Sequence, residues 1–313
     1  MDYIVAGYNM LTDIYYADGS IAKDRPGGSF YSASGVRFWR DRVAYVGTAG
    51  PDFDTWYGPW FQANGIDCRV KKCLPHTLRY TLEYRPDGIW EERCLYGDDY
   101  EAMAKDVGRI TPEMLGACAN ADTKGIYIEA SLSAKIADSF PAVKALIPHG
   151  CLMWEINGDD LRDAGKRAAI LERIAQVDAF SMNLDEARGF FRTEEDAPIL
   201  AGLRALGKPC FLRLGEKGAG FVTPEETVFA PSIGTEDSVD PTGCGNCSTA
   251  AAMVGLAEGK SYEETSAMAN LAAAYCAKQN GPWPLADAAT RRIANEALER
   301  YMAETTFVYG RAL

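Results

Sequence analysis

The chain has fewer basic than acidic residues and no long apolar run, and each shortage excludes a class of protein. With 32 Lys and Arg against 44 Asp and Glu, the net charge of -12 argues against a nucleic-acid-binding protein or one docked on an anionic membrane. A local group of backbone amides, Lys and Arg can still bind phosphate. No apolar stretch reaches the length of a transmembrane helix. The segment 1–7 is too short and too acidic for a secretory signal. We expect it to form a first strand.

Histidine is scarce, and the cysteines do not form the pattern of a disulfide framework. With only His76 and His149 and no second C-x-x-C, a structural zinc site is poorly supported. Nine scattered cysteines, an odd number, are typical of reduced thiols in a cytoplasmic protein. Cys244 and Cys247 form the one close pair, at the start of an expected helix, where a lowered thiol pKa would suit a redox role. The favoured alternative is that they are two small residues lining a tight turn.

Apolar strands alternate with helical stretches along most of the chain. A length of 313 residues, with 47% hydrophobic and 24% charged residues, is typical of one large soluble α/β domain. The alternation predicts a mostly parallel sheet with helices on both faces. The expected strands are 3–7, 42–47, 125–128, 151–156, 179–182 and 209–214, and the expected helices include 29–39, 56–64 and an amphipathic one at 285–303.

Two regions, 14–25 and 70–96, lack helical periodicity. The second has alternating residues at 77–84 and 89–95 around a Pro-Asp-Gly turn at 86–88, which predicts a β-hairpin. We expect these regions to form a lid over a ligand cleft or an oligomer contact, although a hairpin packed on the body is the alternative. The Arg, Tyr and Trp side chains of the region 70–96 would suit a phosphorylated or aromatic ligand. We favour the alternative that they form cross-strand pairs on an exposed hairpin. These side chains are Arg79, Arg85, Arg93, Tyr80, Tyr84 and Trp90.

The segment 240–256 is the most informative in the sequence. Two glycines and a threonine come directly before a run of small, helix-forming residues, with Asp240 upstream. Such a turn exposes backbone N–H groups at a helix N-terminus, which is a site for anions such as phosphate. Asn246 lies where such a site would use a carboxylate to accept a proton.

Three further segments carry weaker signals. Gly27 and Gly28 precede an expected helix and would let backbone approach a ligand closely. Asn183 and Glu186 lie in the first turn of another helix, where they either organise water around Mg²⁺ or phosphate, or cap the helix. The glycine-rich stretch 214–220 either passes under a nucleotide or is a plain hairpin turn, and it matches neither the P-loop nor the dinucleotide motif.

In chain order, these segments resemble the ribokinase-like PfkB family of carbohydrate kinases. The match to the family's two signatures, to its N-x-x-E motif and to its TLGEKG segment covers nearly the whole chain. The matching segments are Gly27-Gly28 with the following helix, 43–52, Asn183-x-x-Glu186, 214–218 and 240–246, the last resembling DTTGAGD.

The resemblance implies a ribokinase-like α/β fold over 1–313, with a small β lid at about 14–25 and 70–96. It also implies ATP- and Mg²⁺-dependent phosphorylation of a hydroxyl group on a sugar or sugar-like molecule, and a homodimer formed through the lid. Neither nucleic acid nor membrane is expected as a partner.

The family's functional residues can be carried over position by position. The implied catalytic set is Asp240, Gly243, Cys244, Gly245 and Asn246. The implied substrate contacts are Asp13, Gly27, Gly28, Ser32 and Asp240. The implied nucleotide contacts are Asn183, Arg213, Gly215, Gly218 and Asn270, with Glu186 holding the metal indirectly.

The chain departs from the family at three of these positions. Asn246 replaces the catalytic Asp, Ser32 replaces an Asn, and Arg213 replaces the Thr of TLGEKG. Arg213 either contacts a phosphate or pairs with an acid. Loss of the base would cost about two to four orders of magnitude in rate.

Three hypotheses follow from these departures. The protein is a kinase that is slow or uses Asp240 or water as its base, or it binds sugar and nucleotide without transferring phosphate. The least favoured is that Asn246 was introduced to trap a complex, or that the cysteine pair has a thiol function.

Overall fold

A large sheet forms the body of the molecule in the computed structural model, which describes residues 1–85 and 90–310. The ten strands of this sheet run in the order β14-β13-β12-β11-β10-β9-β8-β1-β4-β5, parallel from β11 to β5 and antiparallel from β11 to β14. Its strands are β1 (Tyr3–Ala6), β4 (Val43–Ala49), β5 (Asp67–Lys72), β8 (Gly125–Ala130), β9 (Cys151–Ile156), β10 (Ala179–Asn183), β11 (Cys210–Arg213), β12 (Ala219–Val222), β13 (Thr227–Ala230) and β14 (Val308–Tyr309).

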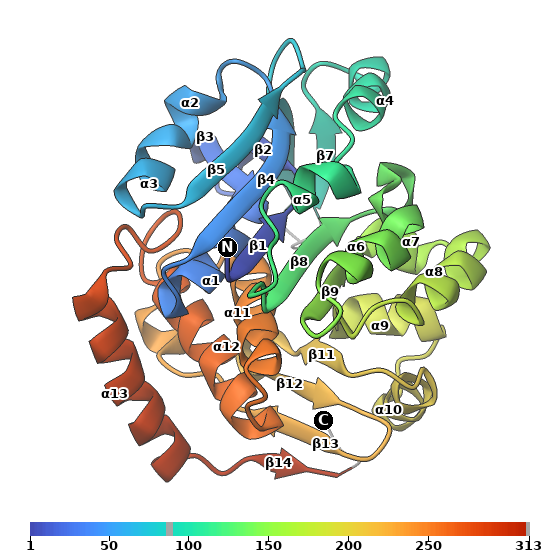
Figure 1. The fold of residues 1–313 in the computed structure, drawn as a ribbon, viewed down its shortest axis with the longest axis vertical. Helices are drawn as coiled ribbons and strands as arrows, with labels where there is room; N and C mark the ends of the chain where they lie inside the picture. The colour runs from blue at the N-terminus through green and yellow to red at the C-terminus, as the bar shows by residue number, and fades with distance from the viewer. Residues whose placement is uncertain (86–89, 311–313) are drawn as a thin grey trace.

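Helices cover both faces of this sheet, so the two sides of each central strand are buried (Figure 1). In β1, Tyr3 and Val5 join one apolar core while Ile4 and Ala6 join the other, because successive side chains of a strand point to opposite faces. The first core is covered by α1 (Ser29–Trp39), α2 (Phe53–Trp56), α3 (Gly58–Ala63), α11 (Cys244–Ala257), α12 (Tyr262–Ala277) and α13 (Ala288–Glu304). The second is covered by α5 (Pro112–Gly116), α6 (Phe140–Leu146), α7 (Gly158–Arg162), α8 (Arg167–Ile174), α9 (Leu184–Phe191) and α10 (Asp196–Ala205).

The strand order reverses between β1 and β8. From β1 the chain adds β4 and β5 on one side, and it then returns to add β8 to β11 on the other side. The crevice at such a reversal, outside the carboxyl ends of parallel strands, is where open α/β sheets bind ligands. In this chain β1 ends just before Gly7, and Glu129 lies near the end of β8.

A second, four-stranded sheet contains the predicted hairpin, with β6 and β7 antiparallel. Its order is β3-β2-β6-β7, with bounds β2 (Asn9–Tyr15), β3 (Ile21–Gly28), β6 (Leu78–Tyr84) and β7 (Trp90–Cys94), and α4 (Asp98–Val107) packs beside it (Figure 1). The predicted turn at 86–88 falls outside the described residues. Arg85 pairs with Glu91 across the hairpin, as the favoured cross-strand interpretation predicts, whereas Arg93 pairs with Glu91 within β7.

Three predicted boundaries are wrong. The first two strands of the second sheet, β2 and β3, span residues 9–28, a longer segment than the expected 14–25. Residues 70–72, expected in the lid, belong to β5, which pairs with β4 at the edge of the large sheet. This strand was missed because an exposed edge strand carries too many polar residues to show an apolar run. The helix expected at 56–64 is the shorter α3, 58–63, and Trp56 instead ends α2; the two helices stay separate because Pro59 lacks the N–H that a continuous helix requires.

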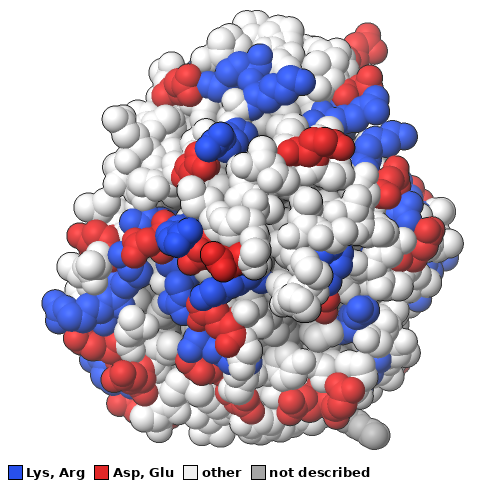
Figure 2. All heavy atoms as spheres, viewed as in Figure 1, with Lys and Arg blue, Asp and Glu red and all other residues white. Residues whose placement is uncertain are grey.

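Close contact between α1 and α11 brings their N-termini together. A Cβ atom on Gly35 of α1 would lie 2.0 Å from the carbonyl oxygen of Cys247 in α11, so residue 35 must be glycine for the helices to pack this way. Short 3-10 turns complete the chain at Leu132–Ala134, Ile136–Ser139, Ala164–Lys166, Gly215–Lys217 and Thr235–Asp237. Within the described residues, no helix is long and apolar enough to cross a membrane. Acidic and basic side chains are interspersed on the face shown in Figure 2.

Candidate functional site

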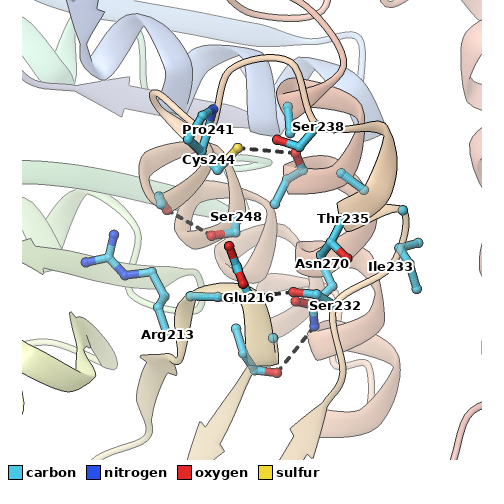
Figure 3. Close-up of a pocket in the computed structure, with 18 of the residues that line it drawn as sticks. Arg213, Glu216, Ser232, Ile233, Thr235, Ser238, Pro241, Cys244, Ser248 and Asn270 are labelled. Carbon is cyan, nitrogen blue, oxygen red and sulfur yellow. Dashed lines mark hydrogen bonds between the residues drawn. The ribbon is translucent and has the colours of Figure 1, made fainter. Parts of the chain in front are cut away.

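A cavity of about 410 Å³ lies between the start of α11 and the β11–β12 turn (Figure 3). All the residues predicted to contact a nucleotide line it, and so do two residues of the predicted anion-binding turn. Those seven are Asn183, Arg213, Gly215, Gly218 and Asn270, together with Cys244 and Gly245. The opposite wall comes from the loop after β13, including Ser232, Ile233, Thr235 and Ser238. The sequence motifs therefore meet at one cavity, although they lie far apart in the chain.

The turn before α11 has the geometry of an anion-binding site. Gly243 is the N-cap in a left-handed conformation, with φ 78°, and its Cβ would lie 2.0 Å from the ring of Tyr31. The N–H of Cys244 closes the turn by donating to the Pro241 carbonyl oxygen, 3.1 Å away. The first N–H groups of a helix have no acceptor within it. Gly245 and Asn246 therefore supply the amides that remain for a ligand.

Asp240 helps to fix the same turn. Its Oδ1 accepts a hydrogen bond from the N–H of Thr242 at 3.0 Å, and its own N–H donates to the carbonyl oxygen of Ala277 at 3.1 Å. Burial, and to a smaller extent the charges of Tyr16 and Asp240, raise the pKa of Tyr84 at the end of β6. The second sheet therefore reaches the neighbourhood of the α11 N-terminus.

Asn183 and Glu186 form a capping box at the start of α9. The Asn183 Oδ1 accepts from the Glu186 N–H at 2.8 Å, and the Glu186 Oε2 accepts from the Asn183 N–H at 2.7 Å. The capping alternative therefore describes their contacts. Burial raises the pKa of Glu186, and the charge of Arg213 opposes that change.

Arg213 pairs with acids, which was one of its two expected roles. Its Nη1 lies 2.8 Å from Oε1 of Glu155, and its Nη2 lies 3.5 Å from Oε2 of Glu186. The Tyr127 hydroxyl donates to Glu155 as well. A Cβ on Gly245 would lie 2.4 Å from the Arg213 Nη1, so the guanidinium packs directly against the anion-binding turn. A fixed positive charge thus lies beside the site, in place of the family's threonine hydroxyl.

The other predicted nucleotide contacts hold the floor of the cavity in shape. The Asn270 Nδ2 donates to the carbonyl oxygen of Ala219 at 3.3 Å (Figure 3). It also donates to the carbonyl oxygen of Ala230 at 3.2 Å, so α12 is tied to both β12 and β13. Gly215 and Gly218 have φ of 61° and 109°, and a Cβ on Gly218 would lie 2.1 Å from the Ala230 carbonyl oxygen. Glycine at both positions therefore lets the backbone form the cavity wall.

The residues predicted to contact substrate lie around the start of α1 and in β2. Gly28, with φ 74°, is the N-cap of α1. Asp13 is buried, and its Oδ1 accepts from the N–H of Asp24 at 2.9 Å and from Arg79 at 2.7 Å. Although burial acts in the opposite direction, these two donors hold the pKa of Asp13 below its ordinary value. Ser32 is fully buried, and its hydroxyl has no hydrogen-bond partner among the described residues.

Gly27 belongs to the same segment but differs from Gly28. A Cβ at position 27 would meet Met10 atoms at 3.4 Å, which is an ordinary van der Waals contact. At Gly28 it would lie 2.2 Å from the carbonyl oxygen of Tyr8. The backbone therefore requires glycine at the second position of the pair.

The sequence analysis missed Ser29 and two acids at the site, Glu129 and Glu155. The Ser29 hydroxyl donates to the Glu129 Oε2 at 2.6 Å, and the Asn246 side chain lowers the pKa of the same carboxyl group. Glu155 is 6% exposed and lies at the carboxyl end of the neighbouring strand. A sequence signal did exist, because each acid is the single charged residue of an otherwise apolar strand, at or next to its carboxyl end.

The expectation of a lowered thiol pKa at Cys244 is wrong. A hydrogen bond with the Cys276 thiol, together with burial, raises the pKa of Cys244. The Cys244 Sγ also donates to the carbonyl oxygen of Ala273 at 3.4 Å (Figure 3). A protonated thiol is a poor nucleophile, so the structure favours the interpretation that Cys244 lines a tight turn.

The residues that line the cavity fit ATP, and Glu186, which pairs with Arg213 of that lining, fits an indirectly held magnesium ion. The capping box uses Oε2 of Glu186, and Oε1 has no hydrogen-bond partner in the described chain. Mg²⁺ in phosphoryl-transfer sites keeps several waters and is held by one or two carboxylates together with the substrate phosphates. One free carboxylate oxygen therefore suits the ion, and the amides beside Arg213 suit the phosphates.

Comparisons with known proteins identify the family. The sequence profile described as pfkB family carbohydrate kinase matches residues 113–287, more than half of the chain. A ribokinase from Arabidopsis thaliana is 36% identical over 93 residues, which cover 29% of this chain but only 24% of that protein.

Solved structures share the fold at lower identity. The adenosine kinase from Sinorhizobium meliloti gives a TM-score of 0.74 at 22% identity, covering 95% of this chain and 99% of that one. A putative ribokinase II from E. coli, in complex with ATP and Mg²⁺, gives 0.71 at 16% identity, covering 96% and 99%. The ribokinase-like fold inferred from the sequence is confirmed.

Proposed function

Because the chain belongs to the pfkB family of carbohydrate kinases, we propose that it transfers the γ-phosphoryl group of ATP to a hydroxyl group of a sugar or sugar-like molecule. One observation carries the proposal: the anion-binding start of α11 opens onto the same cavity as Gly215, Gly218 and Asn270. A phosphoryl group held by the turn and a nucleotide held by the cavity would therefore be adjacent.

The chain's own groups supply most of what phosphoryl transfer needs. The reaction depends mainly on positioning and on stabilising the charge of the transferred group. The amides of Gly245 and Asn246 would donate to its oxygens, with the Arg213 guanidinium beside them as a fixed positive charge. Magnesium, when bound near Glu186, would neutralise the phosphate charge. Sugars and nucleosides are the acceptor classes to test, because the relatives named above include a ribokinase and an adenosine kinase.

Asn246 supports a second candidate function. A carboxamide cannot take up a proton as a carboxylate does, so position 246 lacks the group that would activate the acceptor hydroxyl. The cavity, lined by the neighbouring Cys244 and Gly245, and the capping box at Asn183 and Glu186 are both present. The alternative is therefore a protein that binds sugar and nucleotide as a sensor or partner, without efficient phosphoryl transfer.

ATP turnover separates the two candidates. We would measure ADP release with Mg²⁺ against a panel of sugars and nucleosides, for the wild type, for Asn246→Asp and for Asn295→Asp. Asn295 is exposed on α13, so its variant controls for the added charge. Acceptor-dependent turnover by the wild type supports the kinase. A silent wild type together with an active Asn246→Asp protein supports the binding protein and contradicts the kinase.

We also propose that the second sheet is a lid and joins two copies of the chain. The sheet and the residues directly after β7 expose apolar side chains that a partner would cover, including Ile21, Leu95 and Tyr96, which are 54%, 50% and 38% exposed. Light scattering should show a dimer that Ile21→Lys with Leu95→Lys converts to a monomer. A monomeric wild type at micromolar concentration would contradict this proposal.

A further inference from the structure

Glu129 lies at the point where the fold is expected to bind its ligand. It is next to the last residue of β8, beside β1, and the strand order of the large sheet reverses between these two strands. The residue is partly exposed although burial raises the pKa of its carboxyl group, and the Ser29 hydroxyl at the start of α1 donates to its Oε2 at 2.6 Å. A Cβ on Gly7 would lie 1.7 Å from that hydroxyl and 3.3 Å from the Glu129 Cβ. Glycine at position 7 therefore makes room for the pair.

The same carboxylate faces the residue that replaces the expected base. Glu129 is in register with Glu155 of β9, and the partner of Glu155, Arg213, packs against Gly245 of the anion-binding turn. The Asn246 side chain favours the ionised form of Glu129. Asn246 also supplies one of the backbone amides of the anion-binding turn. A hydroxyl group held at this turn, in contact with the Asn246 side chain, would therefore lie within reach of Glu129.

The charges around Glu129 suit a group that exchanges a proton near neutral pH. Burial raises its pKa to about 7, and the nearby charge of Glu155 acts in the same direction. Hydrogen bonds from Ser29 and Asn246, and the charge of Arg213, oppose that change. A general base works best when its pKa lies near the working pH.

We propose that Glu129 accepts the proton of the attacking hydroxyl group, with Asn246 and Ser29 as positioning residues; this rests on the proposed kinase function. The acceptor O–H bond breaks and its proton passes to the Glu129 carboxylate. The oxygen's electron pair forms the new bond to the γ-phosphorus of ATP. The bond between that phosphorus and the β–γ bridging oxygen breaks, and its electrons leave with ADP. Glu129 then releases the proton to solvent.

Asp240, the other carboxylate near the turn, is less suited to this role. One of its oxygens accepts the N–H of Thr242 at 3.0 Å, so moving it would open the turn that binds the phosphoryl group. The base has therefore moved from the helix to a neighbouring strand, and position 246 has kept a side chain that can hold the hydroxyl by hydrogen bonds.

The test uses the best acceptor found in the panel above. Initial rates from pH 5 to 9 would be measured for the wild type, Glu129→Gln, Ser29→Ala and Glu299→Gln, the last an exposed control on α13. We expect kcat/KM of the wild type to rise with pH and to level off above about 7. Glu129→Gln should lower kcat by about 10²- to 10⁴-fold with little change in KM. Ser29→Ala should move the midpoint to higher pH, because it removes a hydrogen bond to the ionised form.

Adding Asn246→Asp to Glu129→Gln should restore part of the lost kcat, whereas a merely structural loss would not be restored. Circular dichroism would check that each variant is folded. If Glu129→Gln keeps the wild-type kcat and pH profile, the inference is overturned while the kinase function stands. A silent wild type with an active Asn246→Asp protein overturns it in favour of the binding protein. Silence of every protein on every acceptor overturns the proposed function as well.

Discussion

Replacing Glu129 with glutamine should stabilise the protein at neutral pH and have much less effect at acidic pH. In the folded protein, burial raises the pKa of this carboxyl from 4.5 to about 7. Between those two values the folded state holds a proton that the unfolded state has released. Stability therefore falls as pH rises through this window, and it stays reduced above it. Glutamine has nearly the same shape and no charge to bury.

The size of the effect follows from the shift in pKa. A difference of one pKa unit corresponds to about 1.4 kcal/mol, and the shift from 4.5 to about 7 is about 2.5 units. The free energy of unfolding of Glu129→Gln, relative to the wild type, should therefore increase by about 3 kcal/mol between pH 4.5 and pH 7.5. The Ser29 hydroxyl can still donate to the glutamine carbonyl oxygen, so little is lost at low pH.

Urea unfolding, followed by tryptophan fluorescence at half-unit steps from pH 4.5 to 8, measures this difference directly. Groups that titrate alike in both proteins cancel in the comparison. Glu299→Gln, which changes an exposed residue of α13, should give a difference that does not vary with pH. If the Glu129→Gln difference is equally flat, Glu129 is ionised in the folded state at ordinary pH, and the argument for a buried, weakly acidic carboxyl is wrong.

Two further substitutions test the packing of the site. Arg213→Met leaves Glu155 and Glu186 buried without their cation and should lower the free energy of unfolding by about 3–5 kcal/mol. The double variant Arg213→Met with Glu155→Gln should recover part of this loss. If the single variant and the wild type are equally stable in urea, the ion pair is contradicted. Gly35→Ala drives a methyl group into the Cys247 carbonyl of α11 and should lower the free energy of unfolding by about 1–3 kcal/mol, measured by thermal or urea unfolding. The control is Gly58→Ala, because its new Cβ would meet the Asp54 Cβ at 3.7 Å, an ordinary contact. It should change the free energy of unfolding by less than about 1 kcal/mol.

The central strands and α1 could be predicted from the sequence, because their patterns are local. The strand at 151–156 and the helix at 29–39 have the predicted bounds, since an apolar run or a helical stretch between clear breaks leaves little choice. The edge strand β5 could not be found in this way. It is half exposed, and its polar residues resemble those of a loop. Its pairing with β4 depends on the rest of the sheet being in place.

At the site, too, features that depend on short motifs could be predicted, and contacts between residues far apart in the sequence could not. The capping box at Asn183 and the left-handed Gly243 follow from short motifs, and both are present. Arg213 carried two interpretations, and only the fold places Glu155 2.8 Å from it. Glu129 was missed because its partner Ser29 lies 100 positions away, and the two meet only through the reversal of strand order.

The contact at Gly35 also bears on how the protein can move. Because the middle of α1 touches the first turn of α11 through backbone, and the two helices share one apolar core, we expect them to move as one unit. Hinge bending between an acceptor-binding half and a phosphate-binding half would have to break this contact. If the proposed lid closes over a ligand, we expect the four-stranded sheet to move while α1 and α11 stay fixed. Substrate affinity and the alignment of the reacting groups can then vary independently, since the elements that close are not the elements that align.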